Sequence, residues 1–190
     1  MGCYLALLGG QPRRLSLRDL GMPKTFYRRR LPHLQRDNKP HFLTFCTFQR
    51  WVLPEEARSI ALGCCLHDNG VKLDVYAVVI MPDHVHMVFT PLVNHRRLEV
   101  FSLGEIADAI KGASAHKINH ELGRTGRVWQ TESFDRVLRS SGKLDEKIAY
   151  VLDNPVRKGL VESRGEYPWL WVSDAEIAMQ VPLRILASHE

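Results

Sequence analysis

The sequence predicts an α+β fold: a four-stranded antiparallel sheet with ferredoxin-like (split βαβ) connections, helices on one face and an extra C-terminal helix. Hydrophobic periodicity gives the order strand, helix, strand, strand, helix, strand, helix, which is the main observation behind this prediction. The short link Pro82-Asp83 indicates that the strands on either side form an antiparallel pair. A length of 190 residues favours one compact domain.

The first half of the chain is predicted to contain three of the strands and one helix. Residues 41–48 are rich in Phe and Thr and alternate large and small side chains, which is typical of a strand. A helix is expected to begin at Pro54 and to end before Asn69-Gly70, because apolar residues recur between them at helical spacing. Strands are expected over residues 71–81 and 84–90.

The second half is predicted to contain two helices and the fourth strand. Ser102 has the side chain of an N-cap, and apolar residues at helical spacing continue from it to Leu122. The fourth strand is expected over residues 128–138. The third helix is expected over residues 145–154 and to be ended by Pro155, because proline disfavours a helical conformation in the residue before it.

Positive charge is concentrated in the first 40 residues. These hold nine Lys or Arg against two Asp, whereas the remaining 150 hold 17 against 19 acidic residues. Basic side chains displace counterions from a polyphosphate, and aromatic rings stack on bases. The arm that contains Arg28, Arg29, Arg30 and His33 is therefore a candidate DNA contact, with a solvated basic tail as the alternative.

The chain is expected to consist of an uncertain N-terminal extension (residues 1–25), one main domain (26–171) and a C-terminal tail (172–190). Met22 offers a more conventional start, so residues 1–21 are expected to be either an upstream misreading or a disordered extension.

Composition argues against a membrane protein and against a disulfide scaffold. No apolar stretch reaches the roughly 18–20 residues that cross a bilayer, so we expect a cytoplasmic protein. The cysteines contain no CxxC pair, which disfavours a zinc knuckle and favours buried thiols in a reducing cytosol.

His84 and His86 stand two residues apart in the third predicted strand. Side chains alternate between the faces of a strand, so both imidazoles are expected on one face, with Val85 on the other. Two imidazoles placed in this way can present nitrogen atoms to one divalent cation. A histidine pair that is satisfied by hydrogen bonds, without a metal, is the alternative.

Tyr150 and Asn154 are expected on one face of the third helix, because residues four apart are neighbours on a helix. A phenol that attacks phosphorus needs the scissile phosphate beside a cation, and a ligand one turn away would hold that cation near the phenol. The side-chain oxygen of Asn154 is a hard ligand suited to Mg²⁺ or Mn²⁺. The alternatives are a core aromatic for Tyr150 and a helix C-cap for Asn154.

Further motifs accompany these residues in a fixed order along the chain. They are Arg28-Arg-Arg-Leu-Pro-His33, the segment VIMPDHVHMVF over residues 79–89, Val128-Trp-Gln, Phe134-Asp-Arg136, Tyr150-x-x-x-Asn-Pro-Val-x-x-Gly-Leu-Val161 and Tyr167-Pro-Trp169. Together they resemble the motifs of the REP-associated tyrosine transposases, which belong to the single-tyrosine HUH insertion-sequence transposases. The resemblance covers roughly residues 27–170, and no close match precedes Phe26.

The resemblance implies a metal-dependent enzyme that cleaves and rejoins single-stranded DNA, at repeats that fold as hairpins. It implies that His84, His86 and Asn154 bind Mg²⁺ or Mn²⁺, and that Tyr150 attacks the phosphate to give a 5′-phosphotyrosine and a free 3′-OH. The covalent bond would conserve the energy of the phosphodiester, so that rejoining needs no ATP. Such a protein would be associated with the nucleoid, as a monomer or a homodimer.

Further polar residues have two interpretations each. Arg157 and Lys158 would contact phosphates beside the cut, with plain surface charge as the alternative. Arg136, on the fourth strand, is either a DNA contact or the partner of a nearby aspartate. His116 and His120 are four apart on a helix, but without the Glu of HExxH they are expected on a polar surface rather than at a second metal.

Three other functions fit parts of the pattern. A non-cleaving, hairpin-DNA-binding regulator descended from a transposase is the main alternative, although pure binding needs neither the histidine pair nor Tyr150. A cupin-type oxygenase also carries His-x-His on a strand, but it needs a nearby Glu and more strands than this chain offers. Plasmid relaxases and replication initiators share the HUH chemistry, but the chain is short for a relaxase and the Tyr-to-Asn-Pro motif fits transposases better.

Overall fold

The computed structural model describes residues 39–96 and 98–174, which form an α+β structure on a five-stranded antiparallel sheet. The strands of the sheet are β1 (His41–Thr47), β2 (Leu73–Ile80), β3 (His84–Pro91), β6 (Trp129–Val137) and β7 (Leu170–Val172). The helices are α1 (Glu55–Leu66), α2 (Leu103–Glu121) and α3 (Ser141–Arg157). Shorter elements are the 3-10 turns η1 (Phe48–Arg50) and η2 (Arg164–Glu166) and a strand pair, β4 (Val93–Asn94) with β5 (Glu99–Val100).

The sheet has one strand more than the sequence predicts. Its order is β6-β1-β3-β2-β7, and each neighbouring pair is antiparallel, including the predicted pair on either side of Pro82-Asp83. The additional strand, β7, pairs with β2 from Ala77 opposite Val172 to Val79 opposite Leu170. Three residues are too few to show the alternation that marks a strand, so the sequence gives no periodic signal for β7.

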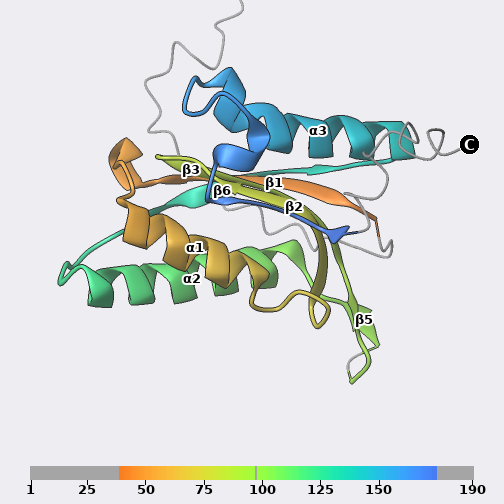
Figure 1. Cartoon of the computed structure of the whole chain (residues 1–190). Coiled ribbons are helices and arrows are strands. Elements are labelled where there is room, and N and C mark those ends of the chain that lie inside the picture. The colour runs from red at the N-terminus through yellow and green to blue at the C-terminus, as the bar shows by residue number, and fades with distance from the viewer. Residues whose placement is uncertain (1–38, 97, 175–190) are drawn as a thin grey trace, which may run out of the picture. The chain divides into compact units, whose positions relative to one another are not determined.

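Helices cover both faces of the sheet: the first two predicted helices share one face, as expected, and the third, whose position the sequence left open, covers the other. Helices α1 and α2 lie on one face and α3 lies on the other (Figure 1). Alternation along β3 explains the two layers, because Met87 and Phe89 join the core with α1 and α2, whereas Val88 joins the core with α3. The central strands are thus buried on both faces.

Helix α3 is longer than predicted at both ends, and Pro155 does not end it. The helix continues to Arg157, and the Lys158 amide donates to the Asn154 carbonyl at 3.0 Å. A proline removes one amide donor, which the last turn tolerates when the following amides still find carbonyls. Gly159, at φ 65°, takes the left-handed conformation that ends the helix.

Helix α2 begins as the sequence predicts. The Ser102 hydroxyl accepts a hydrogen bond from the Glu105 amide, and the Glu105 carboxylate accepts one from the Ser102 amide, which is a complete capping box.

Neither α2 nor another helix of the described ranges is long and apolar enough to cross a lipid bilayer.

A buried hydrogen bond joins α2 to β6. The indole nitrogen of Trp129 donates to the Ser114 hydroxyl at 2.9 Å, and that hydroxyl donates to the Ile110 carbonyl at 2.6 Å. Both side chains are buried, and the edge of the Trp129 ring packs on Phe45 with centroids 4.9 Å apart. Ser114 is therefore the acceptor that allows a polar indole group inside this core.

We predict that Ser114→Ala lowers the free energy of unfolding by about 1–3 kcal/mol, because the Trp129 N–H would stay buried without an acceptor. Urea unfolding of both proteins measures the difference. Ser140→Ala is the matched control, since Ser140 is exposed and its side chain makes no capping bond to α3. An equal loss in both variants would contradict the assignment.

Candidate active site

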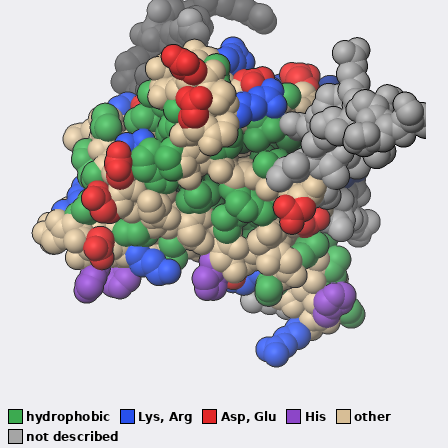
Figure 2. All heavy atoms as spheres, viewed as in Figure 1, with side chains coloured by type: hydrophobic (Ala, Val, Ile, Leu, Met, Phe, Trp, Pro, Cys, Tyr) green, Lys and Arg blue, Asp and Glu red, His purple; other side chains and the backbone are tan. Residues whose placement is uncertain are grey.

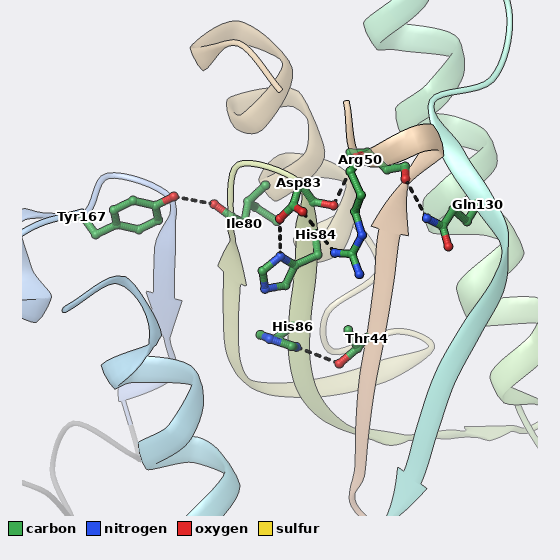
Figure 3. A network of polar contacts seen from close by, with 9 residues as sticks. Thr44, Arg50, Ile80, Asp83, His84, His86, Gln130 and Tyr167 are labelled. Carbon is green, nitrogen blue, oxygen red and sulfur yellow. Dashed lines mark hydrogen bonds and ion pairs between the residues drawn. The ribbon is translucent and has the colours of Figure 1, made fainter. Parts of the chain in front are cut away.

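His84 and His86 lie on the face of the sheet that α3 covers. Their ring centroids are 4.7 Å apart, as the alternation of side chains on β3 predicts. Figure 3 shows both imidazoles on the same side of the strand, His84 beside Asp83 and His86 beside Thr44. His86 is buried and His84 is partly exposed, so the pair lies at the border between core and surface.

The carboxylate of Asp83 fixes the ring of His84. His84 Nδ1 lies 2.6 Å from Asp83 Oδ1, and Arg50 donates to Asp83 Oδ2 at 3.0 Å. Burial alone would raise the pKa of the Asp83 carboxyl, but the hydrogen bonds and charges of His84 and Arg50 outweigh it and lower that pKa. An ionised carboxylate only accepts, so the Nδ1 atom carries the proton that it shares with Asp83.

His86 is held in its neutral form. Burial lowers its pKa to about 3, and the electrostatic effects of His84 and Lys147 add to that lowering. Its Nδ1 atom lies 2.7 Å from the Thr44 hydroxyl. In the tautomer in which Nδ1 donates to Thr44, the Nε2 atom carries a lone pair that is available to a ligand.

Helix α3 brings Tyr150 to the histidine pair. The Tyr150 ring lies 5.4 Å from the His86 ring and 5.9 Å, edge to face, from Phe42, which itself stacks on His86 at 5.3 Å. Ile148 and Val151 on the same helix are buried in the core, whereas Tyr150 is half-buried. Tyr150 therefore packs against the edge of this core, with part of its ring exposed.

Two cations flank the Tyr150 ring. Lys147 Nζ lies 5.1 Å and Arg157 Cζ lies 5.4 Å from its centroid. Lys147 precedes Tyr150 by three residues and Arg157 follows it by seven, so all three share one face of α3. Both charges favour an anionic group such as a phosphate beside the phenol. Arg157 is a predicted contact, whereas Lys147 was not predicted, although its position three residues before Tyr150 on the helix was the available signal.

Asn154 is buried at 4% exposure, and its Oδ1 atom finds no hydrogen-bond partner in the described ranges. The C-cap of α3 is Lys158, so the alternative of Asn154 as a helix cap is wrong. A buried, unpaired amide oxygen is costly and is the kind of atom that a hard cation satisfies. Within residues 39–96 and 98–174, no three His, Cys, Asp or Glu side chains form a metal cluster, a set that does not include the amide of Asn154.

Of the predicted DNA contacts, the structure describes Arg136, Arg157 and Lys158. The β6 register places Arg136 opposite Phe42, on the face of the sheet that carries the histidines. Arg28, Arg29, Arg30 and His33 lie outside the described residues.

His116 and His120 are exposed on α2, on the other side of the sheet from Tyr150. Figure 2 shows histidine side chains at the edge of the molecule over this helix. The prediction that they belong to a polar surface agrees with this position.

No protein-family model and no curated protein matches the chain. Among solved structures, the chain is similar to the REP-associated tyrosine transposase bound to a REP hairpin, with 19% identity over 70% of this chain and 76% of that chain and a TM-score of 0.54. A putative transposase from Deinococcus radiodurans has 22% identity over 60% of this chain and 88% of that chain, with a TM-score of 0.40. A bacterial tRNA(His) guanylyltransferase-like protein in complex with GTP has 10% identity over 65% of each chain, with a TM-score of 0.46. At 19% identity, the first likeness shows a shared fold.

Proposed function

We propose that this chain is a tyrosine transposase of the REP-associated kind, which cleaves and rejoins single-stranded DNA through Tyr150. The observation that carries the proposal is the position of the Tyr150 ring, 5.4 Å from the His86 ring and between the charges of Lys147 and Arg157. Packing of the core does not require two histidines, two cations and a half-buried phenol at one place. The binding of a phosphodiester beside the phenol would make use of all of these groups.

In this proposal His84, His86 and Asn154 hold a divalent cation, Mg²⁺ or Mn²⁺. Such a cation, when bound, would polarise the scissile phosphate and stabilise the charge that develops on it. Asp83 and Thr44 orient the two imidazoles through their Nδ1 atoms, as partners of metal-bound histidines commonly do. The unpaired Oδ1 atom of Asn154 supports its role as the oxygen donor.

In this proposal the reaction begins at the phenol oxygen of Tyr150. The Tyr150 oxygen, once deprotonated, attacks phosphorus, and the bond from phosphorus to the 3′ oxygen breaks. The 3′ oxygen leaves with the electron pair and takes a proton, so the products are a 5′-phosphotyrosine and a 3′-OH. Attack of a 3′-OH on the phosphotyrosine reverses these steps and rejoins the strands. Lys147 and Arg157 offset the negative charge of the phosphate throughout.

The substrate in this proposal is single-stranded DNA beside a hairpin. The REP-associated transposase of similar fold was solved with a REP hairpin, which supports a hairpin substrate here. Arg136, Arg157 and Lys158 would contact the strand near the cut, and the basic arm before residue 39 would add further phosphate contacts. The protein would act as a monomer or a homodimer.

We predict that the full chain with Mn²⁺ forms a covalent adduct with single-stranded oligonucleotides that tile the DNA flanking its gene, and that Tyr150→Phe abolishes the adduct. A label at the 3′ end of each oligonucleotide follows the fragment that stays on the protein through a denaturing gel. Tyr76→Phe is the control, because Tyr76 lies on β2 and bonds Thr90 instead. An adduct that persists in Tyr150→Phe would disprove the role of this phenol, and tight binding without any adduct would favour the non-cleaving regulator.

We predict that Asn154→Leu weakens Mn²⁺ binding at least about tenfold, as expected when a ligand is lost. The same change is expected to keep or raise the stability of the metal-free protein, because leucine removes a buried oxygen without a partner and favours the helix. Calorimetric titration with Mn²⁺ and urea unfolding in EDTA measure the two effects. A loss of stability in EDTA with unchanged Mn²⁺ affinity would show a structural role for Asn154 instead.

A further inference from the structure

Two segments far apart in the sequence meet beside the start of β3. The Phe48 amide in η1 donates to the Val128 carbonyl, at 2.7 Å, in the loop between α2 and β6. In the same place the Arg124 guanidinium carbon lies 3.9 Å from the centroid of the Trp51 ring, and that of Arg127 lies 5.7 Å from the Phe48 ring. We call this group the arginine–aromatic corner; its members are Phe48, Arg50, Trp51, Arg124 and Arg127.

The corner concentrates positive charge. Residues 47–53 and 122–130 together hold three arginines and no aspartate or glutamate. Arg50 pairs with Asp83, but the buried Nη1 atom of Arg124 finds no acceptor in the part of the chain that the structure describes. Arg124 donates through Nη2 to the Arg127 carbonyl, at 3.3 Å, so a backbone oxygen rather than a carboxylate holds it. The Arg124 side chain is partly exposed, so its charge can act on an anion at the surface.

The aromatic rings hold the guanidinium groups rather than offering free faces to bases. A guanidinium stacked on a ring keeps its N–H donors at the edge of its plane, where they can meet phosphate oxygens. The stacking on Trp51 also restricts the rotation of Arg124, so less conformational entropy is lost on binding. The corner is therefore better suited to a phosphate backbone than to the bases.

The corner is connected to the candidate active site by the backbone and by a chain of side-chain hydrogen bonds. The Thr47 amide donates to the Asp83 carbonyl at 2.9 Å, just before η1. Arg50 reaches Asp83 Oδ2 at 3.0 Å, and Asp83 Oδ1 contacts His84 Nδ1 at 2.6 Å, as Figure 3 shows. A strand that lies along the corner would therefore lie next to the histidine pair.

The turn η1 keeps a strained conformation. Gln49 and Arg50 have φ angles of 54° and 57°, in the left-handed region that costs a non-glycine residue about 1–2 kcal/mol. Strain of this kind persists where the surrounding structure holds it, and it is common at ligand sites. In this turn the strained residue Arg50 donates a hydrogen bond to Asp83, and the strained residue Gln49 is exposed beside the corner.

We propose that the arginine–aromatic corner binds the phosphodiester backbone of the DNA strand that enters the candidate active site, with Arg124 and Arg127 each contacting one phosphate. The assignment rests on the proposed function and adds to it the path of the strand. Phosphate contacts carry no sequence information, so the corner raises the affinity for every single strand alike. Recognition of particular bases then belongs to other parts of the protein.

The test is the salt dependence of binding by the full chain, in EDTA so that a metal-dependent reaction stays off. Fluorescence anisotropy follows a labelled oligothymidine and a mixed-sequence strand from about 50 to 200 mM NaCl. Each phosphate contact contributes about 0.7 to the slope of log K against log salt for a single strand, so Arg124→Gln with Arg127→Gln is expected to reduce the slope by about 1.4 for both strands. A slope equal to that of the unmodified protein would overturn the proposal.

Two further variants exclude general effects of charge and folding. Arg96→Gln with Lys143→Gln removes the same charge from the β4–β5 hairpin and from the first turn of α3, which lie at the other end of the sheet in Figure 1, and is expected to leave the slope unchanged. An equal reduction in this variant would overturn the proposal. If the double variant of the corner fails to fold, Arg127→Gln alone, at an exposed position, is expected to reduce the slope by about 0.7.

The outcome separates the corner from the catalytic proposal. A reduced slope in a protein that never forms a covalent adduct would keep the corner as a strand-binding site and reject the nuclease. An adduct with Tyr150 together with an unchanged slope would reject the corner alone.

Discussion

The packing of α3 against the sheet face opposite α1 and α2 is the constraint on which the candidate site depends. Ile148, Val151 and Leu152 bury the helix against strand residues such as Val79 and Val88. This apolar contact fixes the rotation of the helix about its axis. The face with Lys147, Tyr150 and Arg157 is thereby directed to the histidine pair. The distance of 5.4 Å between the Tyr150 and His86 rings is a consequence of that rotation. Apolar contacts of the core therefore set the position of Tyr150, whereas the polar contacts of Asp83 and Thr44 orient the imidazoles.

Burial gives the two histidines different surroundings although they are neighbours on one strand. His86 is buried on the face of the sheet that α3 covers, where burial lowers its pKa and keeps the ring neutral beside Thr44. His84 lies nearer the surface and belongs to a hydrogen-bonded chain with Asp83 and Arg50. The orientation of His84 therefore depends on the strained turn η1, which also forms part of the arginine–aromatic corner. The turn η1 therefore supports both the geometry of the histidine pair and the proposed binding of a DNA strand.

The periodic part of this structure could be predicted from the sequence. The alternation along residues 84–90 places His84 and His86 on one face, and helical spacing places Tyr150 and Asn154 together. Neither period says which face of the sheet a helix covers, so the position of α3 needed the structure. The apolar run over residues 77–80 is typical of a strand that is covered on both faces, but it does not show which helix covers it.

The remaining differences have local causes. The three residues of β7 are too few for a pattern, and α3 passes Pro155 because Gly159 ends the helix instead. The contact of Arg124 with Trp51 joins residues 73 positions apart, which no local pattern reveals. For β7 and for Arg124 the missing information is a tertiary contact, whereas for α3 it is the local conformation of Gly159.

Anomalous diffraction from crystals of the full chain soaked in Mn²⁺ would show whether the two imidazoles and Asn154 bind one cation beside Tyr150. We predict one peak at roughly 2.0–2.3 Å from the Nε2 atoms of His84 and His86 and the Oδ1 atom of Asn154, with the Tyr150 hydroxyl directed to the same space. A peak bound only by exposed histidines of α2, or an ordered Asn154 oxygen that faces away from the imidazoles, would contradict it.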